Sequence, residues 1–199
     1  NSDKVTGADI PKTWKDINDP KWRNAISAKI SSSGLQFVQW YTLGKMYGFD
    51  FWKEFAKQRP RTFDSRVQLY DRLAKGEDKV CAIAEYAAHV LYAKGKGAPV
   101  ALVLPTDGVP ATPLVSGVVD KAPHPNAARL YMDWVMSKRG QAHLQSHPNL
   151  YYGSVHNDAG PLPTGERLGA FKLLFPQDWD DYAGMRDKFT KEWNAMQGL

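Results

Sequence analysis

The sequence predicts an α/β fold in which a mostly parallel sheet is flanked by helices. Residues 80–84 form a short apolar run, which is typical of a strand buried on both faces of such a sheet. Glu85 then opens an Ala-rich helix over residues 86–93, and residues 98–104 predict a second strand. Because ligands of open α/β sheets bind beyond the carboxyl ends of strands, the residues just after position 84 are candidates for a small-molecule site.

Length and composition indicate a folded chain. Its 199 residues suffice for one ordinary domain or two small ones, and 43% apolar residues with seven tryptophans can build a core. No apolar run approaches the roughly 20 residues that span a bilayer. The start lacks an initiator Met and a signal-peptide pattern, so we expect that any export leader has been removed. The single cysteine, Cys81, excludes a disulfide within the chain and favours a small buried side chain over a nucleophile.

The charge pattern argues against nucleic-acid binding. The formal net charge is +5, but lysines and arginines are spread singly among acidic residues. Binding to RNA or DNA favours a basic stripe with interleaved aromatic residues. The nearest candidate, residues 58–66, is better interpreted as a solvated loop.

The first half of the chain alternates strands and helices. Thr13 is expected to cap a short turn whose Trp14, Ile17 and Trp22 face a core, and residues 25–30 predict a strand. A helix is expected to follow Gly34 at once, with one apolar face. The residues of that face are Leu35, Val38, Thr42 and Met46.

Three further helix boundaries follow from local signals. A helix over residues 51–57 buries Phe51, Trp52 and Phe55, and is stopped before Pro60. Asp64 or Ser65 caps the next helix, whose inner stripe holds Val67, Tyr70 and Leu73, with Gly76 past its end. The helix over residues 86–93 should end at Lys94 and Gly95, a cation followed by glycine.

The second half is more broken. Residues 109–117 are linker-like, and residues 115–119 predict a short strand. Asn126 is expected to cap a helix that Lys138, Arg139 and Gly140 end. The apolar stripe of that helix is Ala127, Leu130, Tyr131, Trp134 and Val135. Residues 146–166, with Pro148 and several glycines, are turn-like, and a closing helix starts near Asp178.

Three adjacent serines stand between the strand at residues 25–30 and the helix after Gly34. Ser31, Ser32 and Ser33 would present hydroxyls and backbone N–H groups beside the positive end of a helix dipole. Such a turn could cradle an oxyanion such as a phosphate, phosphonate or carboxylate. The alternative is that one serine only caps the helix.

Three residues that follow the strand at 80–84 are further candidates. The Tyr86 phenol could donate to an anion or ligate a metal, or else pack as part of the interior. Glu85 and His89 lie four residues apart, a spacing that could hold half of a metal site but is more often found in surface neighbours.

Four segments together resemble the extracellular solute-binding proteins of bacterial ABC importers, in the branch that includes ferric-ion, phosphonate and polyamine binders. The segments are PKTWKDINDPKWRNAI from residue 11, LAKGEDKVCAIAEYAAHVLYAKGKGAPVALVLPTDG from residue 73, APHPNAARLYMDWVMSKRGQ from residue 122, and DWDDY with KEW from residue 178. This resemblance implies the type II periplasmic-binding-protein architecture, in which two α/β lobes joined by crossing strands hold a solute between them.

The resemblance also implies a division of the chain. Residues 1–104 would be the second, solute-facing lobe. Residues 105–145 would form a hinge return and a helix normally packed on the first lobe, and residues 146–199 a loop and a helix that pack back on the second lobe. The returning hinge strand would be residues 98–105. The opening part of the first lobe would be absent, which makes the two-lobe architecture incomplete.

A function and a set of partners follow from the same resemblance. The chain would bind a small polar, anionic solute in the periplasm or at the extracellular membrane surface, and deliver it to the transmembrane subunits of an ABC permease. Homo-oligomers could form through a lobe surface that the missing N-terminal lobe would otherwise cover. No cofactor is expected.

The resemblance also implies a role for Ser65 and allows a test of iron binding from the positions of the tyrosines. Ser65 resembles the family position at the start of a helix, where it could contact solute or act only as a cap. Ferric-ion members typically carry paired tyrosines near the position of Tyr86, whereas this sequence has one tyrosine there. The pair Tyr151 and Tyr152 falls in the later loop. Iron is therefore disfavoured.

Two other classes stay open. A hydrolytic or metal-dependent α/β enzyme would need a recognisable motif, but the sequence has no GxSxG, HExxH, phosphate-binding or dinucleotide-binding loop in the required context. The five histidines have no spacing typical of a triad or a metal cluster. A pure interaction module would fit if many aromatic residues proved to be exposed.

Overall fold

A computed structural model describes residues 1–147 and 150–198 of the chain. The chain divides into two compact units. Unit 1 comprises Asn1–Thr112 and Lys172–Leu199, and unit 2 comprises Pro113–Phe171. Pro148 and Asn149, part of the predicted turn-like stretch, lie outside the described residues, as does the side chain of Lys94.

Unit 1 contains a parallel three-stranded sheet of order β2-β1-β3. β1 (Ile26–Lys29) is central, and β2 (Arg61–Phe63) and β3 (Val80–Ile83) pair with it on either side. The structure confirms the two strands predicted near residues 25–30 and 80–84. β2 was missed because it lies in the charged stretch interpreted as a solvated loop, and its three residues are only partly buried. The predicted α/β class is confirmed.

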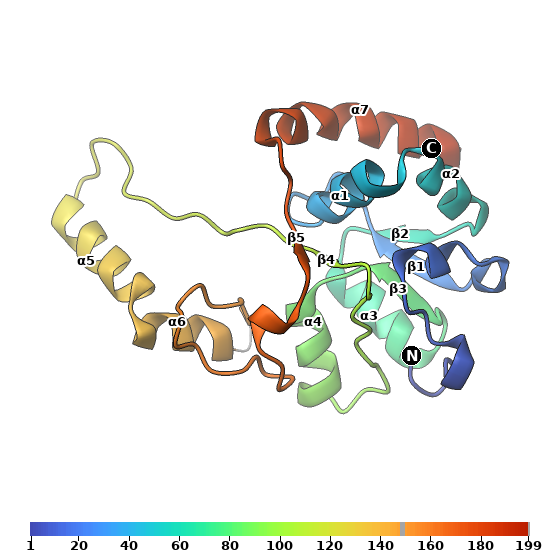
Figure 1. Cartoon of the computed structure of the whole chain (residues 1–199), viewed down its shortest axis with the longest axis horizontal. Coiled ribbons are helices and arrows are strands. Elements are labelled where there is room, and N and C mark those ends of the chain that lie inside the picture. Colours follow the sequence, from blue (N-terminus) through green and yellow to red (C-terminus); the bar gives the residue numbers. More distant parts are fainter. Residues whose placement is uncertain (148–149, 199) are drawn as a thin grey trace. The chain divides into compact units, whose positions relative to one another are not determined.

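One face of the sheet is covered by α1 (Phe37–Tyr47), α2 (Asp50–Lys57) and the C-terminal helix α7 (Trp179–Gln197) (Figure 1). Their core is aromatic: the Trp40 ring centroid lies 4.5 Å from that of Trp52 and 4.8 Å from that of Trp193. Phe55 stacks on Trp193. The α7 prediction is confirmed, and packing against α1 and α2 makes the end of the chain part of this core.

The other face of the sheet carries α3 (Arg66–Lys75) and α4 (Tyr86–Val90), which continues as a π-helical turn over Leu91–Gly95 (Figure 1). Its smaller core is formed by Leu69, Tyr70, Leu73, Ala88, Tyr92 and Val100. Gly76 ends α3 in the left-handed conformation, as predicted. Helices on both faces explain why β1 is wholly buried.

Two predicted apolar stripes were partly wrong. Val38 and Thr42 are buried as predicted, but Leu35, which precedes the start of α1 at Phe37, and Met46, in its last turn, are exposed. Trp40 and Leu43, which were not in the predicted stripe, are fully buried. Val67 is also exposed on α3. Burial on α1 extends beyond the predicted stripe because this helix packs against both α2 and α7.

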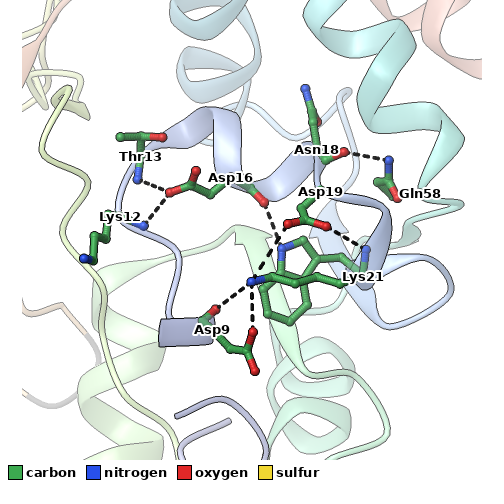
Figure 2. A network of polar contacts seen from close by, with 9 residues as sticks. Asp9, Lys12, Thr13, Asp16, Asn18, Asp19, Lys21 and Gln58 are labelled. Atoms are coloured by element: carbon green, nitrogen blue, oxygen red, sulfur yellow. Dashed lines mark hydrogen bonds and ion pairs between the residues drawn. The ribbon is translucent and has the colours of Figure 1, made fainter. Parts of the chain in front are cut away.

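The amino-terminal segment forms three short 3-10 turns, Gly7–Asp9, Trp14–Asn18 and Pro20–Trp22. Figure 2 shows their polar network: the N–H groups of Lys12 and Thr13 donate to the Asp16 carboxylate at 2.7 and 2.8 Å. These two bonds hold the pKa of Asp16 below its ordinary value. The indole of Trp22 donates to the Asp16 carbonyl at 2.8 Å, which fixes the turn against the core.

A buried carboxylate ties the amino ends of the strands together. Asp78 is fully buried, and it accepts from the guanidinium of Arg61, at the start of β2, and from that of Arg72 on α3. The Arg72 Nε–Asp78 Oδ2 distance is 2.8 Å. The network joins three elements at the end of the sheet opposite to the carboxyl edge.

The strand predicted at residues 98–104 was wrong. All of these residues are described, and their backbone shows no strand pairing. Instead, β4 (Val109–Pro110) pairs in parallel with β5 (Leu173–Leu174), where the chain leaves unit 1 and returns to it. An apolar run forms a strand only where a neighbouring segment can pair with its backbone. Here the residues that find such a partner, β5, are Val109 and Pro110, a few positions after the predicted strand. The short strand predicted at residues 115–119 does not form either.

Unit 2 contains α5 (Pro125–Met136), α6 (Lys138–Ser146) and a 3-10 turn over Leu168–Ala170. The predicted cap was wrong, because His124 is the N-cap and Pro125 the first helical residue. Ser137 breaks the predicted helix and caps α6, where its hydroxyl accepts from the Gly140 N–H at 3.1 Å. In residues 1–147 and 150–198, no helix has both the length and the apolar character needed to cross a membrane.

Candidate functional site at the carboxyl edge of the sheet

The parallel sheet brings the predicted site residues to one edge. Lys29 of β1 pairs with Phe63 of β2, and Ser31 and Ser65 each lie two residues further along. Ala28 of β1 pairs with Ile83 of β3, and Ser31 and Tyr86 each lie three residues further along. Three segments separated in sequence therefore meet beyond adjacent strand ends, where α/β proteins bind ligands.

The three serines differ in what they can offer. The Ser31 hydroxyl is buried and donates to the Thr190 hydroxyl of α7 at 3.3 Å. The Ser33 hydroxyl donates to the side-chain oxygen of Gln36 at 2.6 Å. Ser32 is exposed, and the space beside Gly34 is open. Ser32 is therefore the most accessible hydroxyl of this turn, which we call the serine turn (residues 31–34).

The serine turn does not cap α1 as predicted. Gln36 is the N-cap of α1, and the backbone carbonyl of Ser33 accepts from the Phe37 N–H at 2.9 Å. The residues between Gly34 and Gln36 form an extra turn. The serine turn therefore lies next to the start of α1, but no serine hydroxyl accepts a hydrogen bond from the first N–H groups of this helix.

The C-terminal helix α7 holds the serine turn in place. The Arg186 guanidinium donates to the Ser32 carbonyl, and the Tyr182 hydroxyl donates to the Gly34 carbonyl at 3.5 Å. Burial raises the pKa of Tyr182, and the nearby Arg186 opposes this rise. The phenol therefore stays a neutral donor, and an exposed cation lies beside the turn.

Ser65 is confirmed as the N-cap of α3. Its hydroxyl accepts from the Gln68 N–H at 3.3 Å, and the side chain is exposed. A capping serine can also face a ligand, because its position is the start of a helix whose dipole favours anions.

Tyr86 begins α4 and is half-buried. The turn before it is fixed from both faces of the sheet. Gln39 of α1 donates to the Ala84 carbonyl at 2.8 Å, and the Tyr70 hydroxyl of α3 donates to the Glu85 carbonyl at 2.9 Å. Burial raises the pKa of Tyr70, so this phenol remains protonated. The position of Tyr86 is thus set by two partly buried hydrogen bonds that sequence reasoning missed.

Glu85 and His89 lie in different surroundings. The Glu85 carboxylate pairs with Arg66 at 3.5 Å, and His89 is buried within α4. Across the described parts of the chain, no group of three or more His, Cys, Asp or Glu side chains could hold a metal ion.

The charges nearest the edge were also missed. Lys29 is buried at the end of β1, and its ammonium donates to the backbone carbonyl of Asp64. The Asp64 carboxylate lies 3.6 Å from the same ammonium. A lysine at the end of a strand predicted to be buried was the signal that could have drawn attention to this pair.

A separate open hollow lies at the opposite end of the sheet. Its lining includes Arg23, Arg59 and Lys57, with Met196 and Gln197 from the last turn of α7. Cations at the C-terminal ends of α2 and α7 complement the negative ends of the helix dipoles. This arrangement explains the hollow's charge without a ligand, and its lining includes none of the predicted site residues.

Unit 1 is an α/β lobe whose chain leaves after β4 and returns just before β5, and these two short strands pair in parallel. The family model described as "Bacterial extracellular solute-binding protein" matches residues 1–168, so the chain belongs to this family. The match confirms the suspected family and the predicted periplasmic or extracellular location.

Similar proteins agree with this assignment. An uncharacterized protein of Haemophilus influenzae is 29% identical over 194 residues, which are 93% of this chain and 55% of the relative. The periplasmic binding protein AfuA from Actinobacillus pleuropneumoniae, solved with exogenous fructose-6-phosphate bound, has 24% identity and a TM-score of 0.73. That match covers 96% of this chain and 61% of AfuA.

Iron-bound HitA from Pseudomonas aeruginosa has 18% identity and a TM-score of 0.66, over 97% of this chain and 64% of HitA. At these identities the structures confirm the predicted fold of a periplasmic-binding-protein lobe. The chain spans about half the length of the curated relative it matches. The family and these neighbours are binding proteins, not enzymes.

Proposed function

We propose that this chain is part of the substrate-binding component of an ABC importer and that it captures a small polar, anionic solute without changing it chemically. The observation that carries the proposal is the meeting of the serine turn, Ser65 and Tyr86 beyond three adjacent parallel strands, in a chain of a solute-binding family. Hydroxyl and amide donors in such a place bind oxyanions. A hydrolytic or metal-dependent enzyme is the alternative that this proposal excludes.

Capture would work by closure. The solute bridges the edge described above and the first lobe, shifts the protein from an open to a closed state, and the closed form is recognised by the membrane permease. Ser31, Ser32, Ser33, Ser65 and Tyr86 are the proposed ligand-binding residues. Because the Ser31 and Ser33 hydroxyls have partners within the protein, we expect these two to act mainly through the backbone of the turn.

The division of the chain at residues 104 and 145 stays a prediction, as do the missing N-terminal lobe and a homo-oligomer. Exposed apolar side chains on α5, among them Leu130 and Tyr131, support a role for that helix in packing against another lobe. The ligands bound to AfuA and HitA, fructose-6-phosphate and iron, differ in charge. The serine turn supports the anionic class.

A thermal-shift screen of the intact protein tests the proposal. Phosphonates, sugar phosphates, polyamines and ferric salts form the panel, and we expect stabilisation by a member of the anionic classes. Ser32→Ala and Tyr86→Phe should each weaken binding of that solute by about 2- to 10-fold, the usual contribution of one hydrogen bond. Ser2→Ala, an exposed serine at the amino terminus, is the matched control. No response to any class, together with turnover of an ester or phosphoester, would favour an enzyme instead.

A further inference from the structure

Lys29 places a nearly buried positive charge at the candidate solute edge. It is the last residue of the central strand β1, and only 8% of its side chain is exposed. Burying an ammonium group is costly unless a partner compensates for the lost water. Its position at the edge of the sheet therefore calls for a compensating anion.

The compensation that the structure gives Lys29 is weak. Its two polar contacts are both with Asp64: a hydrogen bond to the backbone carbonyl and an ion pair at 3.6 Å to the carboxylate. The ion-pair distance is beyond that of a good N–H···O hydrogen bond. The Asp64 side chain is 82% exposed, so water screens the pair. The ammonium group has three N–H donors, and the hydrated Asp64 carboxylate is a poor acceptor for them.

The surroundings add further positive potential. Asp64 directly precedes Ser65, the N-cap of the ten-residue helix α3, and the start of a helix repels a cation and attracts an anion. Arg66, the next residue, already has Glu85 as a partner at 3.5 Å. The Lys29 ammonium is therefore a buried charge whose one acidic partner, the Asp64 carboxylate, is exposed and can rotate away into water.

We propose that Lys29 makes this edge select solutes with an oxyanion group, and that Asp64 is a resident counter-ion that the solute's oxyanion displaces. This inference rests on the proposed function and adds to it a specificity-determining residue. When the solute arrives, its oxyanion takes the place of the Asp64 carboxylate beside the ammonium and the α3 start. Without solute, Asp64 keeps the buried charge paired.

Opposite effects of two substitutions test the displacement. Isothermal titration calorimetry on the intact protein would use fructose-6-phosphate, inorganic phosphate and uncharged fructose as probes. Lys29→Met, which keeps the side-chain volume, should weaken binding of the phosphate probes at least about tenfold. Asp64→Asn should tighten it about 2- to 5-fold, because the competing carboxylate is gone. The matched controls are Lys53→Met and Asp50→Asn, an exposed ion pair on α2, and neither should change affinity.

Each contrary result has a distinct meaning. Equal affinity of Lys29→Met and the parent for phosphate probes, with binding still weakened in Ser32→Ala, overturns the role of Lys29 and keeps the proposed function. Stabilisation only by polyamines or ferric salts overturns the role of Lys29 and the anionic class of the solute, and keeps solute capture. Weaker binding in Asp64→Asn overturns the displacement. Failure of every solute class in the thermal-shift screen overturns both. If Lys29→Met does not fold, the exposed Asp64→Asn substitution still decides the displacement.

Discussion

Replacing Asp78 by alanine should remove the charge that holds the amino ends of β2 and β3 beside α3. Asp78 is fully buried and accepts from Arg61 and Arg72, the latter at 2.8 Å from Nε. The substitution deletes both charge-assisted contacts and leaves two guanidinium groups without their shared partner. It touches none of the proposed solute-binding residues.

The magnitude follows from the two contacts and the exposure of their donors. Hydrogen bonds to charged groups contribute about 1.5–3 kcal/mol each, so two of them set an upper range of about 3–6 kcal/mol. The Arg61 and Arg72 side chains are 40% and 27% exposed, and water can replace part of what they lose. Arg72 also keeps its pairing with Glu77 at 2.6 Å. We therefore expect a loss of about 3 kcal/mol in the free energy of unfolding, the lower end for a broken buried pair.

Urea unfolding followed by tryptophan fluorescence measures this loss, because every tryptophan except Trp134 lies in unit 1. With an m-value of about 2 kcal/mol per molar urea, the midpoint should fall by about 1.5 M. Asp50→Ala is the matched control: it breaks the exposed Asp50–Lys53 pair and should leave the midpoint unchanged. An Asp78→Ala midpoint within about 0.2 M of the parent would refute the reasoning.

Three further outcomes are expected. Trp193→Ala, which removes a buried ring stacked on Phe55, should lower the free energy of unfolding by about 3–5 kcal/mol in the same urea assay; a loss below about 1 kcal/mol would mean that α7 is not part of the core. The lowered pKa of Asp16 gives stability that is complete above its ordinary pKa of 3.8 and is lost as pH falls below that value. Asp16→Asn should therefore reduce the change of the urea midpoint with pH between about pH 4 and about pH 2. The same change with pH in the variant and the parent would contradict this. Burial raises the pKa of the Cys81 thiol, so Ellman's reagent should label it much more slowly in the native protein than in urea, and equal rates would show that the strand is open.

Local signals in the sequence predicted much of the secondary structure. The apolar run of β3, the Ser65 cap and the glycine after α3 have local physical causes, and all three are in the structure. Residues 98–104 are as apolar as β3 but form no strand, because strand formation depends on a hydrogen-bonding neighbour that the run itself does not reveal. β2 shows the converse: a charged segment becomes a strand because β1 lies beside it.

The candidate site was predictable only in part. Serines after one strand and a tyrosine after another pointed to the carboxyl edge, because the edge rule needs only strand positions. The partners that hold these residues, such as Gln39, Tyr70 and Arg186, lie far away in sequence and could not be found without the fold. The pairing of Lys29 with Asp64 depends on the register of two strands, one of which was not predicted.

A crystal structure of the intact protein with a solute identified by the thermal-shift screen would locate the binding site directly. We predict that polar atoms of the solute lie within hydrogen-bond distance of the serine turn, Ser65 and Tyr86, with an oxyanion group beside the Lys29 ammonium. Solute bound elsewhere, for example in the hollow lined by Arg23 and Arg59, with the carboxyl edge of the sheet unchanged, would contradict the proposed capture site.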